Sequence, residues 1–109
     1  MAYKIVYSPA ALNDLDEIFE YIENELFNRS GAGNTVSKIL SSINKLQEFP
    51  DIGAKLRQII NVNNEYRYLI TGNYLTFYRH TDDTVYIDRI IYSRRDYMRI
   101  LFDDSEQES

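Results

Sequence analysis

The chain has 109 residues, of which 44% are hydrophobic and 27% charged, a composition typical of one globular domain rather than of a disordered chain. It contains no Cys and a single His, which excludes disulfides, thiolate metal sites, a Cys nucleophile and paired His ligands. No apolar run is long enough to span a membrane, and the N-terminus lacks the pattern of a signal peptide, so we expect a cytoplasmic protein.

The net charge of −5 is distributed unevenly along the chain. Residues 1–28 carry one Lys against six acidic residues, residues 29–102 carry a net charge of +4, and the last seven residues carry four acids. We expect a single domain of residues 1–102, followed by a disordered acidic tail of residues 103–109 that has no apolar side chain. The acidic total charge argues against a protein that holds nucleic acid by charge alone.

The N-terminal part is predicted to form a strand and a helix. Tyr, Ile and Val dominate residues 3–7, as expected of a β-strand. Ser8 is a preferred N-cap and Pro9 is tolerated at the first helical position, so a helix is predicted over residues 9–27. The acidic residues of this helix, Asp14 among them, are expected on its solvated side. Its apolar residues recur at steps of three and four and predict one buried stripe: Leu12, Leu15, Phe19, Ile22 and Leu26.

A second helix is predicted over residues 31–48. Residues 28–31 end the first helix, and Phe49-Pro50 ends the second, because the residue before a proline disfavours the α region. Two amphipathic helices joined by a short loop form an antiparallel hairpin. The buried stripe of the second helix is predicted to contain Ala32, Val36, Ile39, Ile43 and Leu46.

The period of the apolar residues changes to two in the C-terminal half. Strands are predicted over residues 66–71, 74–81 and 84–92, joined by tight turns, whereas residues 54–64 fit either a short strand or a helical turn. A short, partly apolar piece follows over residues 97–102. The order β-αα-βββ predicts an α+β fold, in which an antiparallel twisted sheet carries the helical hairpin on one face.

Few residue patterns point to catalysis or to a bound metal or cofactor. His80 is the one imidazole base, but its place beside a turn favours a solvent-facing histidine over a member of a Ser-His-Asp triad. Asp16, Glu20 and Glu23 share one helix face, which favours a solvated face over a cation site because no facing element is evident. No metal site and no cofactor are predicted.

Arg and Tyr residues are interleaved from residue 66 onward, where six Arg and seven Tyr occur. This mixture is typical of contact surfaces for protein or RNA. The alternation of a strand places Arg67 on the face of Leu69, away from Tyr66 and Tyr68. The alternative is structural, with Tyr packing across strands and Arg pairing with Asp88 or Asp96. The candidates for contact with a target or a protein partner are Arg67, Arg79, Arg94, Arg95 and Tyr97.

Four segments resemble the RelE/ParE toxin superfamily, in the same order along residues 3–102. They are Tyr7-Ser8-Pro9-Ala10-Ala11-Leu12-Asn13-Asp14-Leu15, Leu46-Gln47-Glu48-Phe49-Pro50-Asp51-Ile52-Gly53, Asn73-Tyr74-Leu75-Thr76-Phe77-Tyr78-Arg79 and Val85-Tyr86-Ile87-Asp88-Arg89-Ile90-Ile91-Tyr92-Ser93-Arg94-Arg95-Asp96. The resemblance implies the toxin of a type II toxin–antitoxin pair, with the β-αα-βββ fold and an antitoxin that wraps around it. RelE-like members cut mRNA on the ribosome, and ParE-like members inhibit DNA gyrase by binding.

At two positions, the resemblance separates RelE-like nucleases from ParE-like toxins. RelE-like nucleases commonly carry an Arg within the second meander strand and a Tyr or His near the C-terminus, where this chain has Leu75 and about Leu101. Arg95 matches a basic position of the nucleases, and Arg95 and Tyr97 are the catalytic candidates if the chain is a ribonuclease. Arg stays protonated and would stabilise charge rather than act as a base. The resemblance therefore favours a ParE-like toxin that binds gyrase or another protein, with a ribosome-dependent mRNA endoribonuclease as the alternative.

Overall fold

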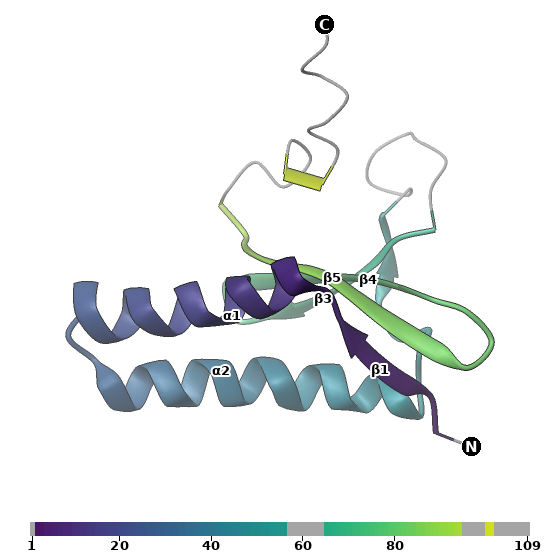
Figure 1. Cartoon of the computed structure of the whole chain (residues 1–109), viewed down its shortest axis with the longest axis horizontal. Coiled ribbons are helices and arrows are strands. Elements are labelled where there is room, and N and C mark those ends of the chain that lie inside the picture. The colour runs from purple at the N-terminus through teal and green to yellow at the C-terminus, as the bar shows by residue number, and fades with distance from the viewer. Residues whose placement is uncertain (1, 57–64, 95–99, 102–109) are drawn as a thin grey trace, which may run out of the picture.

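The computed structural model describes residues 2–56, 65–94 and 100–101. Figure 1 shows two long helices side by side beneath a sheet. The elements, in chain order, are β1 (Lys4–Tyr7), α1 (Pro9–Glu20), the π turn η1 (Tyr21–Glu25), α2 (Arg29–Asn44), the 3-10 turn η2 (Lys45–Gln47), β2 (Ala54–Lys55), β3 (Arg67–Thr71), β4 (Tyr74–His80) and β5 (Thr84–Tyr92).

The predicted α+β fold is confirmed, with a mixed sheet in place of a wholly antiparallel one. The strand order is β1-β5-β4-β3-β2. The three-strand meander β3-β4-β5 is antiparallel as predicted, but β1 runs parallel to β5, from Lys4 opposite Thr84 to Tyr7 opposite Ile87. The two helices separate β1 from the meander and let β5 run in the direction of β1, as a parallel pair requires.

The helical hairpin covers one face of the sheet, and its two stripes agree unequally with the prediction. Of the second predicted stripe, Ala32, Ile39 and Ile43 of α2 and Leu46 of η2 are buried. The first helix is rotated from its predicted position, because it buries Ala11, Asp14, Ile18 and Ile22 and leaves Leu12 and Leu26 more than half exposed. Its α-helical part ends at Glu20, where η1 begins, so the prediction of a helix to residue 27 was too long. The α2 helix begins at Arg29, with Asn28 as its N-cap.

Asp14 is buried against the edge of β5, contrary to the prediction of a solvated side chain. The pairing of β1 with β5 ends at Tyr7, opposite Ile87. Beyond this point, Ser8 and Asp14 form hydrogen bonds with the backbone of β5 in place of β1. The Ser8 hydroxyl donates to the Asp88 carbonyl at 2.7 Å, and the Ile90 N–H donates to Asp14 at 2.8 Å. Arg89 also donates twice to this carboxylate, both at 2.8 Å. Periodicity alone could not reveal this, since the partners lie about 75 residues apart in sequence.

The loop after η2 is fixed to the sheet by Tyr78. The Tyr78 side chain is fully buried, and its hydroxyl donates to the Pro50 carbonyl at 2.7 Å and accepts from the Gly53 N–H at 2.9 Å. Arg67 donates to the Gly53 carbonyl at 2.8 Å from the neighbouring strand. The end of the helical layer is thereby held against β3 and β4.

The other face of the sheet carries a second apolar cluster. Leu56, Leu75, Phe77 and Ile91 are buried there. Tyr66, Tyr68, Ile100 and Leu101 pack against them. Figure 1 places the short helical piece Ile100–Leu101 on the side of the sheet away from α2. We call this side of the sheet the open face.

Three sequence predictions concern segments that the structure describes only in part. Of residues 54–64, Ala54–Lys55 form β2 and residues 57–64 lie outside the described residues. Of residues 97–102, only Ile100 and Leu101 are described, and the tail 103–109 lies outside. Among the described residues, no helix has the length and apolar character needed to cross a membrane.

Candidate functional site on the open face of the sheet

A β-bulge on β5 directs a carboxylate onto the open face. Phe77 lies opposite Arg89 and Tyr78 lies opposite Ile87, so Asp88 is the extra residue of β5. The Asp88 carboxylate accepts a hydrogen bond from the Tyr66 hydroxyl. Bulges re-aim side chains and are frequent at functional sites. The bulge thus presents a charged group beside the apolar cluster of this face.

Arg79 and Tyr86 lie next to this pair. They are opposite each other on β4 and β5, and each alternates with residues that face the helices, so both side chains are on the open face. The Arg79 guanidinium carbon lies 5.3 Å from the centroid of the Tyr86 ring, within the range of a cation–π contact. We call Tyr66, Arg79, Tyr86 and Asp88 the open-face cluster.

The electrostatics of the cluster favour binding over proton abstraction. Burial, followed by the hydrogen bond to Asp88 and its charge, raises the pKa of Tyr66 to about 12, although Arg79 acts in the opposite direction. The phenol is therefore protonated at neutral pH and donates its proton to Asp88. Arg79 is a permanent cation and is exposed. The cluster offers an anionic partner a cation and two aromatic rings.

The structure separates the residues predicted to make contacts. Arg79 is on the open face and Arg94 is exposed beyond the far end of β5. Arg67 lies on the helix side with Leu69, as the alternation predicted, and its guanidinium is 3.4 Å from the Asp51 carboxylate. Arg67 therefore has a structural role, and a contact with a partner remains a prediction. Arg95 and Tyr97 lie outside the described residues.

His80 is held by the loop after η2 rather than turned freely to solvent. Its Nε2 lies 2.7 Å from Asp51 Oδ1, and its Nδ1 lies 2.9 Å from the Thr81 carbonyl oxygen. Both atoms facing the ring are oxygen acceptors, so both hydrogen bonds form together only with a protonated imidazole. The hydrogen bond from His80 lowers the pKa of Asp51. This arrangement suits an ion pair that closes the sheet better than a general base.

No group of three or more His, Cys, Asp or Glu side chains converges on a metal-binding geometry in the described part of the chain. The carboxylates of α1 and η1 are spread along the helices, and Glu23 pairs with Arg29 at 3.3 Å. The chemistry of the described residues therefore resides in hydrogen-bond donors, aromatic rings and fixed charges.

Sequence reasoning missed two parts of this arrangement. It offered Asp88 only as a partner for Arg, whereas Asp88 binds Tyr66, and it left Asp14 and Arg89 unpaired. The sequence of β5 contains no pattern that would predict the bulge at Asp88. Helical spacing from Ala11 to Ile18 was a signal that the Asp14 position is buried, but it does not identify the partners on β5.

Comparisons with known proteins place the chain in a family. A family described as "ParE toxin of type II toxin-antitoxin system, parDE" matches residues 5–97. The fold resembles a chain of the chromosomal ParDE toxin–antitoxin system from P. aeruginosa, with a TM-score of 0.70, 20% identity and coverage of 84% of this chain and 96% of that one.

It also resembles a chain of the toxin–antitoxin complex RelBE2 from Mycobacterium tuberculosis, with a TM-score of 0.58, 20% identity and coverage of 84% and 99%. No curated protein sequence matches the chain. The family match spans most of the domain, and the predicted resemblance is confirmed. The chain belongs to the ParE toxins of type II toxin–antitoxin systems, within the RelE/ParE superfamily.

Proposed function

We propose that this toxin arrests growth by binding a protein target, with DNA gyrase as the expected target, and that it is not a nuclease. One observation carries the proposal. Leu75 and Leu101 occupy the positions at which the resemblance to RelE-like nucleases leads one to expect an Arg and a Tyr or His. Both belong to the apolar cluster of the open face, where Leu75 is 9% exposed and Leu101 packs against the same cluster.

An apolar cluster at these positions suits a contact surface. Leu can neither transfer a proton nor stabilise the charge of a phosphorane. Buried Leu and Phe beside half-buried Tyr and exposed Arg instead suit an interface in which a few residues carry most of the binding energy. The open face therefore supports recognition of a protein better than cleavage of RNA.

A cognate antitoxin is the second partner of the proposal. Both solved neighbours are described as toxin–antitoxin systems or complexes. We expect the antitoxin of this chain to cover the open face and to neutralise Arg79 with Asp or Glu side chains. A small open reading frame next to this gene is the expected source. Both partners would meet the chain in the cytoplasm.

The alternative function, cleavage of mRNA on the ribosome, has one observation in its support, which is that the open-face cluster holds a cation near a phenol. Arg79 could stabilise a phosphate, and the Tyr66 phenol, held protonated by Asp88, could donate a proton to a leaving group. This alternative requires Tyr66 for activity, together with Arg95 or Tyr97. The binding proposal requires only the shape and charge of the face.

Pulse labelling tests the two functions directly. The chain is induced alone in a bacterial host, and thymidine and leucine incorporation are followed together over the first minutes. We expect DNA synthesis to fall first and Arg79→Gln to weaken the effect, while Lys38→Gln, which removes an exposed charge from α2, leaves it unchanged.

Three results would contradict the proposal. An earlier fall in leucine incorporation, with primer extension showing cuts within codons, would identify a ribonuclease. A folded Tyr66→Phe variant that loses all toxicity would point to the same conclusion. Continued growth with both kinds of incorporation intact would show that the chain is not toxic in that host.

A further inference from the structure

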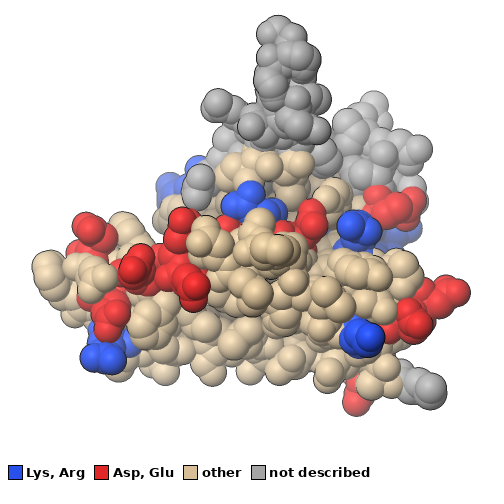
Figure 2. Space-filling model, in the orientation of Figure 1, with Lys and Arg blue, Asp and Glu red and all other residues tan. Residues whose placement is uncertain are grey.

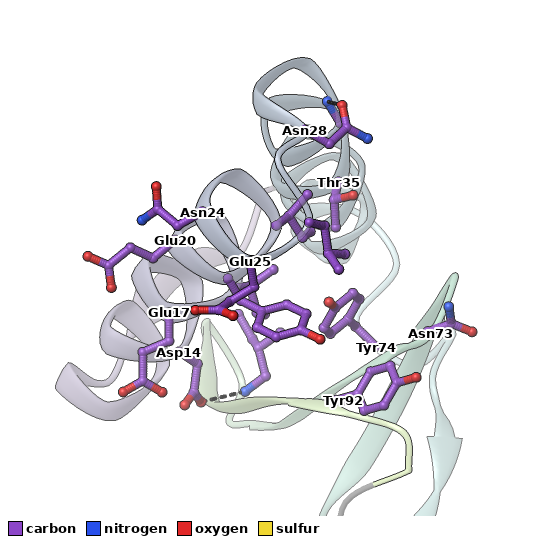
Figure 3. Close-up of a pocket in the computed structure, with 16 residues that line it drawn as sticks. Asp14, Glu17, Glu20, Asn24, Glu25, Asn28, Thr35, Asn73, Tyr74 and Tyr92 are labelled. Carbon is purple, nitrogen blue, oxygen red and sulfur yellow. Dashed lines mark hydrogen bonds between the residues drawn. The ribbon is translucent and has the colours of Figure 1, made fainter.

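A groove of about 860 Å³ lies on the helix side of the sheet, away from the open-face cluster. It is bounded by the end of α1, by η1, by the beginning of α2, by the β3–β4 turn and by the end of β5 (Figure 3). A volume of this size is within the range that accommodates drug-sized ligands, so it has room for several side chains of a peptide. The open-face proposal above does not use this groove.

The groove is acidic. Its lining residues in the described part of the chain include four carboxylates and no Lys or Arg. Asp14 is occupied by Arg89 and the Ile90 N–H, and Glu17 accepts a 3.2 Å hydrogen bond from Asn13. Figure 2 shows acidic side chains gathered at the end of the molecule where α1 and η1 lie.

Within the described part of the chain, the two remaining carboxylates have no ion-pair partner. Glu20 and Glu25 make neither an ion pair nor a hydrogen bond with the described residues. Their negative charge is therefore available to a cation from outside. Both carboxylates belong to the helical side of the groove, and Figure 3 shows Glu20 pointing away from Tyr74 and Tyr92.

Tyrosine rings form the opposite wall, whereas the aliphatic Ile18, Ile22 and Leu26 belong to the helical side. Tyr74 and Tyr92 lie with ring centroids 5.7 Å apart, across the groove from the helical carboxylates (Figure 3). Burial, and to a smaller extent Tyr92 and Tyr21, raises the pKa of Tyr74, so the phenol remains a neutral donor. Ring faces of Tyr attract Lys and Arg side chains, and the aliphatic residues of the groove favour apolar neighbours of that cation.

The helical wall has an unusual backbone at the same place. In η1 the Leu26 N–H donates to the Tyr21 carbonyl at 3.3 Å, five residues back, and both ends of this π turn line the groove. Phe27 follows at a φ of 52° with its side chain 89% exposed. Isolated π turns and non-glycine residues at positive φ cost free energy and cluster at functional sites.

We infer that this groove docks a segment of a partner polypeptide that presents one Lys or Arg between apolar side chains. The cation would lie near Glu25 and the tyrosine rings, within the negative field of Glu17 and Glu20, and an apolar neighbour would lie against Leu26, which is 55% exposed. By charge complementarity, the groove favours a cationic segment, whereas Arg79 on the open face favours an anionic one. The inference does not depend on the target or on the toxicity of the chain.

Titration of the full chain with two peptides tests the inference. The probes are Ac-Leu-Lys-Leu-NH₂ and Ac-Leu-Glu-Leu-NH₂, followed by NMR of the ¹⁵N-labelled protein. We expect the Lys peptide to shift the amides of Asn73, Tyr74 and Tyr92, with a Kd on the order of 1 mM, and the Glu peptide to bind at least about tenfold more weakly.

Variants of equal net charge separate the groove from the charge of the whole molecule. Glu17→Gln, Glu20→Gln and Glu25→Gln together should weaken the Lys peptide by about tenfold. The matched control neutralises three exposed acids elsewhere, Asp16→Asn, Glu48→Gln and Asp82→Asn, and should leave the affinity within about twofold.

The inference is wrong if both peptides bind alike, if the shifted amides lie on the open face, or if the control triple weakens binding as much as the groove triple. Far-UV circular dichroism of each triple establishes that the fold is intact. Absence of gyrase inhibition or of toxicity would count against the proposed function and leave this result unaffected.

Discussion

At the scale of single residues, the buried Asp14 carboxylate has the largest expected effect on stability. It is 6% exposed and accepts hydrogen bonds from Arg89 and from the Ile90 N–H, the group that β1 leaves unpaired. The hydrogen bonds to Asp14 raise the pKa of Arg89, so the guanidinium is charged at every pH at which the protein folds. This one side chain connects the first helix to the last strand.

We predict that Asp14→Asn lowers the free energy of unfolding by about 2–3 kcal/mol. The amide keeps one acceptor but loses the charge, and it turns an N–H toward Arg89 or Ile90. The loss is smaller than for a fully buried ion pair, because the Arg89 side chain is 27% exposed and water reaches it. Urea denaturation followed by circular dichroism measures the change. Asp16→Asn, on the exposed side of the same helix, should change stability by less than about 0.5 kcal/mol, and an equal loss in both variants would refute the argument.

At the scale of elements, the loop after η2 explains one of the segments on which the family resemblance rests. Pro50 and Gly53 bind the Tyr78 hydroxyl, and Asp51 binds Arg67 and His80. The segment from Leu46 to Gly53 therefore connects the helical layer to β3 and β4. A Cβ added at Gly53 would lie 2.5 Å from the Tyr78 hydroxyl oxygen and 2.8 Å from the Tyr68 carbonyl oxygen.

Two glycine substitutions of opposite sign test this connection. Gly53→Ala should destabilise the protein by about 2–3 kcal/mol, because the buried Tyr78 must move and give up its hydrogen bonds. Gly33→Ala should stabilise it by about 0.5–1 kcal/mol, because Gly33 lies within α2 and a Cβ there meets nothing within 4 Å. Thermal or urea unfolding compares both with the parent chain. A Gly53→Ala variant as stable as the parent would show that the loop adjusts.

The elements were predictable where local pattern determines them, and the site was not. Apolar spacing predicted the β3–β5 meander almost to the residue, and strand alternation placed Arg67 with Leu69. The second helix was predicted over residues 31–48, whereas α2 is Arg29–Asn44 and the 3-10 turn η2 follows to Gln47. The bulge at Asp88 and the burial of Asp14 depend on pairing between strands and between a helix and a strand, which periodicity does not reveal, and the π turn η1 has no signature in the apolar spacing. Those long-range contacts build the open-face cluster and the groove, so the functional surfaces required the structure.

At the scale of the whole molecule, the fold places acidic and basic side chains on different surfaces, a separation that the net charge of −5 does not show. Carboxylates of α1 and η1 surround the groove, whereas Arg79 and Arg94 are exposed on the open face and just beyond β5. Over distances greater than the Debye length, about 10 Å at 0.1 M salt, a partner experiences the near patch more than the net charge. The two faces can therefore receive partners of opposite charge at the same time.

The sign of a salt dependence tests this separation for the antitoxin expected to cover the open face. If its contacting segment is acidic, it is attracted by Arg79 and repelled by the net charge of the toxin. We predict that the local attraction dominates, so that the association rate constant falls as salt rises from about 0.05 M to about 0.5 M. Arg79→Gln should reduce the rate at low salt by about two- to threefold and flatten the salt dependence, whereas Lys38→Gln on α2 should do neither. Stopped-flow mixing of the two proteins measures these rates. A rate that rises with salt would mean that the net charge governs the encounter and that the acidic segment does not dock on the open face.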